Sequence, residues 1–102
     1  MRRLGVKMVM IAYNSAIESD VMEALRKCGI GNYTKWTQVQ GKGKISGSHF
    51  GSETWPGENS VIFSALEGEK ANSLLSYINK LRAKLGKLGI KAFAWNLEEV
   101  TR

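Results

Sequence analysis

Two segments of the chain are apolar on both faces of a strand, which is typical of the central strands of a sheet. The first runs from about Leu4 to Tyr13 and the second from about Asn59 to Leu66. A segment rich in Thr, Trp, Val and Tyr, from about Tyr33 to Gln40, predicts another strand. A last strand is expected from about Ile90 to Val100.

Apolar residues at helical spacing predict two helices between these strands. Ser15 and Glu18 have the spacing of a capping box, in which each side chain accepts from the other's free backbone amide. The first helix is expected to run to about Cys28 and to end at Gly29. The second is expected from about Glu69 to Leu85 and is followed by two glycines. The apolar stripes are Ile17, Val21, Met22, Leu25 and Cys28 in the first helix, and Leu74, Ile78, Leu81 and Leu85 in the second.

The order β-α-β-β-α-β with right-handed crossovers predicts an α+β, ferredoxin-like sandwich, in which two helices cover one face of a four-stranded antiparallel sheet. The first and third strands are central in that fold, in agreement with their two apolar faces. The helices cover only one face, so the other face requires a cover from outside the chain. We therefore expect self-association through the open face, as a closed ring.

Length and charge narrow the interpretation. The 102 residues form one domain, residues 1–102, and the longest apolar run is far shorter than the roughly 20 residues of a membrane-spanning helix. Cys28 is the one cysteine and can form no disulfide within the chain, which favours the cytoplasm. The net charge is +6, and residues 80–91 hold five cations and no acid. Such a cluster attracts phosphate groups. The alternative is that these cations form the solvated face of a helix.

Two glycine- and lysine-rich segments are candidates for anion binding, because glycine lets backbone amides approach an anion closely. One is 41–47 (GKGKISG), at the end of the second predicted strand, and the other is 85–91 (LGKLGIK), at a helix-to-strand turn. The alternatives are a flexible hairpin and a helix C-cap with favourable cations. The first segment has the form of neither a P-loop nor a dinucleotide fingerprint, since no helix follows it.

Other side chains support weaker hypotheses. Trp36, Phe93 and Trp95 could stack on bases, although a place in the core or an interface is the simpler expectation. His49 lies near Glu53 and, with Cys28, could bind a metal shared between subunits. No pair of residues has the form of a nucleophile and its base, so we do not expect an enzyme.

The residues from 20 to 47 resemble the nitrogen regulatory PII family. Similar to that family are the helix segment Asp20-Val21-Met22-Glu23-Ala24-Leu25, the turn Gly29-Ile30, the strand end Val39-Gln40-Gly41-Lys42-Gly43-Lys44, and Gly47. The resemblance implies a trimer of ferredoxin-like subunits that binds nucleotide in the clefts between them. Carried over by position, Gly41, Gly43 and Lys44 line the phosphate cleft from one side. Gly86, Gly89 and Lys91 of a neighbour line it from the other, with Lys87 nearby.

The sequence also departs from the family. The loop of about residues 46–57 is shorter and lacks the tyrosine that the family modifies, and the second glycine turn lacks an Asp-Gly pair. We therefore expect a divergent, cytoplasmic, PII-like homotrimer. It would bind a small anionic effector, an adenine nucleotide, without requiring a cofactor, and would act through the 46–57 loop on a partner such as a transporter or an enzyme. The alternatives are a metal-responsive trimer similar to copper-tolerance proteins, with His49 and Glu53 as ligands, and a nucleic-acid-binding module that uses Lys80 to Lys91. We expect neither a nucleic-acid partner nor membrane insertion.

Overall fold

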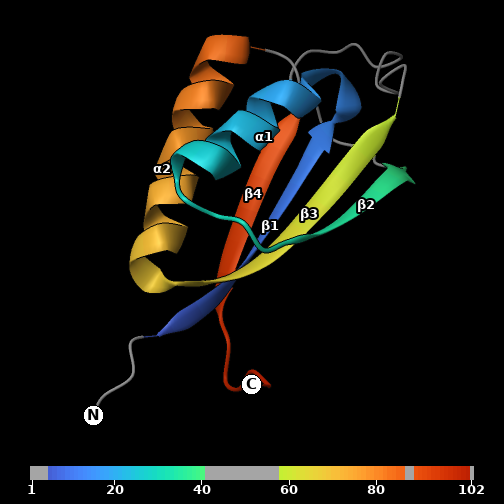
Figure 1. Ribbon diagram of the computed structural model, residues 1–102. Coiled ribbons are helices and arrows are strands. Elements are labelled where there is room, and N and C mark those ends of the chain that lie inside the picture. Colours follow the sequence, from blue (N-terminus) through green and yellow to red (C-terminus); the bar gives the residue numbers. More distant parts are fainter. Residues whose placement is uncertain (1–4, 41–57, 87–88, 102) are drawn as a thin grey trace.

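The computed structural model describes residues 5–40, 58–86 and 89–101. These residues form four strands, one 3-10 turn and two helices (Figure 1). In chain order the elements are β1 (Val6–Asn14), η1 (Ser15–Ile17), α1 (Glu18–Lys27), β2 (Thr34–Val39), β3 (Asn59–Glu67), α2 (Gly68–Leu85) and β4 (Ile90–Asn96).

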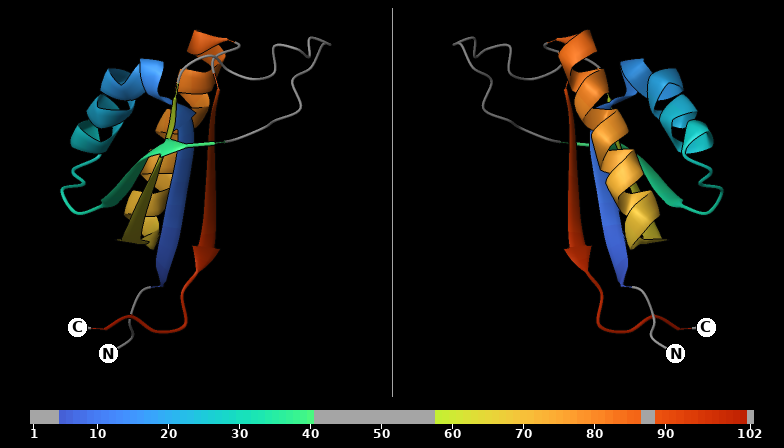
Figure 2. Two further views of the ribbon diagram at one scale, coloured as in Figure 1. Left: turned by 90° about the vertical axis from the view of Figure 1, so that its right-hand side faces the viewer. Right: turned by 90° about the vertical axis from the view of Figure 1, so that its left-hand side faces the viewer.

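The strands form one antiparallel sheet in the order β2-β3-β1-β4. Both helices lie on one face of this sheet, and no helix or strand of the described residues covers the other face (Figure 2). The arrangement confirms the ferredoxin-like sandwich, with β1 and β3 as the central strands. No helix of the described residues is long and apolar enough to cross a membrane.

The core fills the space between the sheet and the helices. β1 contributes Val9, Ile11 and Tyr13, each only 1% exposed, because alternate residues of a strand face the same side. Val21 of α1 and Leu74 of α2 are fully buried against them. The other buried apolar residues of this cluster are Ile17, Ala24, Leu25, Ile30, Ile62, Leu66, Ala71, Ile78, Leu81 and Ile90.

The open face carries a row of apolar side chains. Met10 of β1 pairs with Phe63 on one side and with Phe93 on the other. Trp36 of β2 meets the edge of the Phe63 ring, with the ring centroids 5.1 Å apart. Trp36, Phe93 and Trp95 are 54%, 42% and 45% exposed, so none of these three aromatic residues belongs to the core of a single chain.

The start of the first helical segment differs from the predicted capping box. Asn14 is the cap, because its Oδ1 accepts from the Ala16 amide at 2.8 Å. The Ser15 hydroxyl lies 2.9 Å from that of Ser60, and the Glu18 carboxylate turns toward the sheet. The predicted capping box is therefore wrong, since the side chains of Ser15 and Glu18 both have partners on other elements.

The boundaries of two strands, β1 and β4, also differ from those predicted. β1 begins at Val6 and extends one residue beyond Tyr13, and β4 ends at Asn96 rather than near Val100. Strand pairing explains these limits, because β1 pairs with β3 from Val6 to Asn14, and its register with β4 ends at Lys7 and Asn96. Beyond that pair, the Leu97 amide still donates to the Val6 carbonyl at 2.9 Å.

Candidate functional site

The expected site residues that the structure describes lie at one end of the sheet. β1 and β2 finish there and β3 and β4 begin there, because β3 is antiparallel to β1 and β2, and β4 is antiparallel to β1. We call this the loop end (Figure 1). Val39 and Gln40 lead from it into residues 41–57, and Glu58 leads back into β3. The turn from α2 to β4 lies at the same end.

The structure places three of the expected site residues at the loop end. Gly86 ends α2 with a φ of +70°, a conformation that favours glycine, and its amide donates to the Arg82 carbonyl at 3.1 Å. The carbonyl of Gly89 accepts from the Asn14 amide at 2.9 Å. Lys91 is exposed and pairs with Ala12 of β1, so it lies on the open face of β4.

The other expected site residues lie outside the described residues. They are Gly41, Gly43, Lys44 and Lys87, and the alternative metal ligands His49 and Glu53. The structure therefore fixes the positions from which segments 41–57 and 87–88 leave the sheet. Within one chain, Glu58 and Gly89 lie on the two sides of the turn from β1 to η1. The Ser15 amide donates to the Glu58 carbonyl at 2.7 Å, and the Asn14 amide donates to the Gly89 carbonyl.

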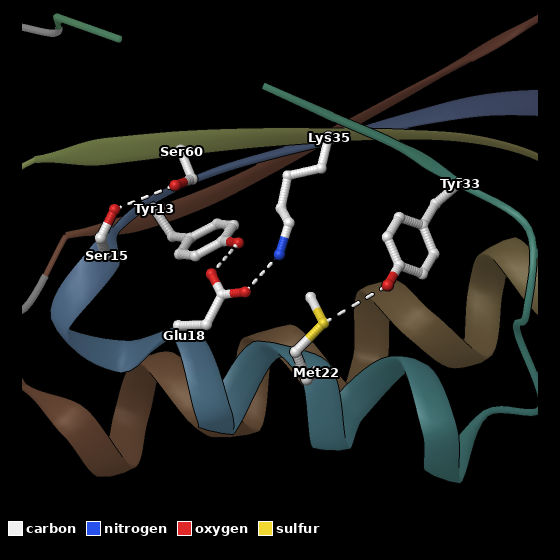
Figure 3. A network of polar contacts seen from close by, with 7 residues as sticks. All are labelled: Tyr13, Ser15, Glu18, Met22, Tyr33, Lys35 and Ser60. Carbon is white, nitrogen blue, oxygen red and sulfur yellow. Dashed lines mark hydrogen bonds and ion pairs between the residues drawn. The ribbon is translucent and has the colours of Figure 1, made fainter. Parts of the chain in front are cut away.

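A polar network joins three elements beside this turn (Figure 3). The Tyr13 hydroxyl of β1 donates to Oε1 of Glu18 at 2.6 Å. The Lys35 ammonium of β2 donates to the other carboxylate oxygen of Glu18 and forms an ion pair with it. Glu18, in the first turn of α1, thus links the helical layer to a central strand and to an edge strand. No local sequence motif marks this network, because its members come from three separate elements.

The network changes the acidity of two of its members. Burial by itself raises the pKa of Glu18, but the hydrogen bonds from Lys35 and Tyr13 and the Lys35 charge together lower it below the ordinary value. Burial, and then the hydrogen bond to the Glu18 carboxylate, raise the pKa of Tyr13 far above its ordinary value. Tyr13 therefore remains a neutral donor and Glu18 a charged acceptor at neutral pH.

The edge strand β2 is irregular where it approaches the loop end. Its pairing with β3 shifts between Trp36 and Val39, as in a β-bulge. Gln38 in this irregular stretch has a φ of +58°, which a residue with a side chain rarely adopts. Its side-chain amide donates to the Glu58 carboxylate at 3.2 Å, across the two ends of residues 41–57.

A buried acceptor lies at the base of residues 41–57. Asn59, the first residue of β3, is 9% exposed, and its Oδ1 has no hydrogen-bond partner within the part of the chain that the structure describes. An unpaired buried acceptor is costly, so a donor from outside the described residues would stabilise this position.

A groove of about 600 Å³ lies where β2 begins, toward the other end of the sheet. Its walls combine open-face side chains with the segment that precedes β2, namely Met8, Gly31, Asn32, Tyr33, Thr34, Phe63, Ser64 and Ala65. A smaller hollow of about 310 Å³ shares Gly31, Asn32 and Ala65 with it. No sequence motif marks this groove, because its walls come from three separate segments.

Metal binding has no support from the described residues. No three His, Cys, Asp or Glu side chains among residues 5–40, 58–86 and 89–101 gather in a way that could hold a metal ion. Cys28 follows the end of α1 that lies away from the loop end. Since a ten-residue helix is about 15 Å long, Cys28 is too far from the loop end to share a metal ion with residues there in one chain. Burial raises the pKa of the Cys28 thiol, which disfavours the thiolate that binds metals.

The basic stretch is exposed on α2. Lys80, Arg82 and Lys84 are exposed in the last two turns of α2, and the ion pairs of the described residues do not include them. Cations at this position also complement the negative end of a helix, so their exposure alone does not define a nucleic-acid interface.

The fold and the loop end together define a ferredoxin-like domain with a glycine-rich turn and an exposed lysine at one end of its sheet. The model of the family "Nitrogen regulatory protein P-II" matches residues 6–102. The chain therefore belongs to the PII family and is a PII-like regulatory protein. The sequence matches none of the curated proteins with which it was compared.

Solved structures of similar fold carry the same family description. CPII, a nitrogen regulatory PII-like protein from Thiomonas intermedia, was solved bound to ADP, AMP and bicarbonate. It is 20% identical to this chain over 96% of this chain and 94% of CPII, with a TM-score of 0.69. A PII-like signalling protein from Thermus thermophilus is also 20% identical, over 95% of this chain and 90% of that one, with a TM-score of 0.64. At these identities the likeness shows the fold alone.

Proposed function

We propose that this chain is a cytoplasmic, homotrimeric sensor that binds an adenine nucleotide in the clefts between its subunits. The bound nucleotide changes residues 46–57, and these residues act on a partner protein such as a transporter or an enzyme. Proteins of this signalling family are generally not enzymes, and the proposed role is binding without catalysis. The physical basis is a higher affinity of the nucleotide for one of two loop states.

The observation that carries this proposal is the convergence at the loop end. Gly86, Gly89 and Lys91 lie on the β4 side of the sheet, and residues 40 and 58 lie on the β2 side. Strands lie about 4.8 Å apart, so the two sides are separated by about 14 Å within one chain. A neighbouring subunit would bring its own Gly86–Lys91 turn against Gly41, Gly43 and Lys44, with Lys87 close by.

The groove at the start of β2 supports a position for the base of the nucleotide within the proposed site. Phe63 lines the groove, and Asn59 at the loop end precedes it by four residues, which is about 13 Å along a strand. That separation is comparable with the length of an extended nucleoside diphosphate. A base in the groove would lie beside Phe63 and Tyr33, with its phosphates toward the loop end.

The open face supports the trimer. Its exposed aromatic side chains and the methionines of β1 form an apolar surface that a lone subunit leaves in water. Three copies in a closed ring would bury this surface and would also form the clefts. Both CPII structures contain ADP and bicarbonate, and one contains AMP as well, which are anions of the proposed kind.

A binding panel on metal-stripped protein tests the proposal. Titration calorimetry with ATP, ADP, AMP and bicarbonate is compared with zinc, copper and cobalt, each added alone. We expect an adenine nucleotide to bind, and Lys91→Ala to weaken its affinity by about tenfold, as for the loss of a charged hydrogen bond. Lys27→Ala, far from the loop end, is the matched control.

Two results would contradict the proposal. Binding of a metal with no response to any nucleotide would favour the metal-responsive alternative and make His49→Ala the next variant. Equal affinities for nucleotide in the Lys91 variant and the wild type would remove Lys91 from the site.

A further inference from the structure

The edge strand β2 is weakly held by its own backbone. Among the described residues it pairs with β3 alone, the pairing is interrupted between Trp36 and Val39, and most of its residues are exposed. Edge strands of this kind open more readily than central ones. β2 ends at Val39, one residue before the end of the described segment at residue 40, so its position sets the point from which the chain continues into residue 41.

Lys35 is the side chain that ties β2 to the helical layer. Thr34 and Trp36 pair with Phe63 and Val61 on the open face, so Lys35 between them faces the helices. Its ammonium group reaches the Glu18 carboxylate, and only 27% of the Lys35 side chain is exposed. The other two ion pairs of the described residues lie within α1.

Glu18 is itself held by the core. Tyr13, which is 1% exposed, fixes one carboxylate oxygen at 2.6 Å and leaves the other for Lys35 (Figure 3). A carboxylate held by a rigid neighbour loses little conformational freedom when it pairs, so the pair is stronger than an ordinary surface pair. The contacts of Tyr33 with Met22 and of Ser64 with Asn32 hold the segment before β2 and are independent of Lys35.

We propose that Lys35 is a positioning residue for effector binding. Through Glu18 and Tyr13, it fixes β2 to the helical layer and so holds the origin of residues 41–57 in the geometry that binds the effector. This inference rests on the proposed function for its effect on binding, but its effect on β2 is independent of any ligand.

Lys35→Met tests the inference, because methionine keeps much of the side-chain length and removes the charge. Lys35→Arg keeps the charge and the donors, and Arg26→Met removes a cation from an exposed pair on α1. Glu18→Gln is a second way to break the pair, since the amide oxygen can still accept from Tyr13. Amide hydrogen exchange of residues 35–39 is measured without ligand, with the β1 amides as the internal reference, and ADP affinity is measured by calorimetry.

We expect exchange at residues 35–39 to rise about three- to tenfold in Lys35→Met and in Glu18→Gln, while the β1 amides stay unchanged. The dissociation constant for ADP should rise by a similar factor. Lys35→Arg should keep both the exchange rates and the dissociation constant close to the wild-type values, and Arg26→Met should change neither quantity.

The outcomes separate the two proposals. Unchanged exchange at residues 35–39 in Lys35→Met overturns the inference, whatever happens to ADP. Faster exchange with an unchanged ADP affinity also overturns it, because Lys35 would then stabilise β2 without positioning the site. If wild-type protein binds no nucleotide, the proposed function fails, whereas faster exchange in the same variants would still show that Lys35 holds β2.

Discussion

The Glu18 carboxylate makes three favourable interactions at once. It lies in the first turn of α1, where a negative charge interacts well with the helix dipole, and it also accepts from Tyr13 and Lys35. A capping box would have satisfied only the backbone of its own helix. The interactions with β1 and β2 became available because residues 13, 18 and 35 meet in the folded chain, which local spacing could not reveal.

Acid should remove the contribution of Glu18 to stability. Because the folded state lowers the pKa of Glu18, its contribution is present at neutral pH and is lost as the pH falls below about 5 and through the folded pKa. We therefore expect Glu18→Gln to lower the free energy of unfolding at pH 7. Between pH 7 and pH 3, the free energy of unfolding should fall less in this variant than in the wild type. Urea unfolding across this range checks the expectation. Glu23→Gln, which removes only exposed pairs, should leave the pH dependence close to that of the wild type.

Gln38 offers a second test at the residue scale. A left-handed residue other than glycine costs about 1–2 kcal/mol, so Gln38→Gly relieves backbone strain while Gln38→Ala retains it. Both variants lose the same hydrogen bond to Glu58. After the entropy cost of glycine, we expect Gln38→Gly to be more stable than Gln38→Ala by up to about 1 kcal/mol. Equal unfolding midpoints in urea would show that the bulge adapts without strain.

At the scale of elements, the central strands and both helices could be predicted because burial imposes a repeating pattern on them. Val9, Ile11 and Tyr13 alternate with residues of the open face, and Leu74, Ile78 and Leu81 follow the helical repeat. The bulge of β2 has no such pattern, since its residues face solvent on an edge. Of the candidate site, the glycine turn and Lys91 could be predicted from composition, whereas the groove and the Glu18 network depend on contacts between distant segments.

The buried stripe of α2 carries a large part of the stability. Leu74 is fully buried, and its truncation leaves a cavity between the helix and the sheet. We expect Leu74→Ala to lower the free energy of unfolding by about 2–5 kcal/mol. Asn79→Ala, on the exposed side of the same helix, should change it by less than about 0.5 kcal/mol. Chemical denaturation of the two variants at one protein concentration makes the comparison.

At the scale of the whole molecule, the uncovered sheet face is the largest departure from a self-sufficient fold. A ferredoxin-like sandwich with two helices has cover for one face only, and here the other face is apolar across β2, β3, β1 and β4. The sequence predicts this imbalance because both central strands are apolar on both sides. The proposed ring resolves it without any further element.

A charge on the open face should break the ring. Phe93 is 42% exposed in the single chain, so Phe93→Asp removes little from the core of a subunit. We expect its mass in solution, measured by light scattering, to fall from about three times 11.3 kDa to that of one chain, with its helical circular dichroism retained. Asn79→Asp, on the helical side, should keep the assembled mass. A single-chain mass for the wild type would contradict the proposed trimer directly.

The common direction of β1 and β2 has a consequence for how a partner would be met. Rotation about one axis preserves direction along that axis, so the loop ends of all copies in the proposed ring would lie on the same rim. A partner with matching symmetry would then touch three equivalent segments at once, and weak single contacts would combine into strong avidity. Occupancy of one, two or three clefts could thereby produce a graded response from identical subunits.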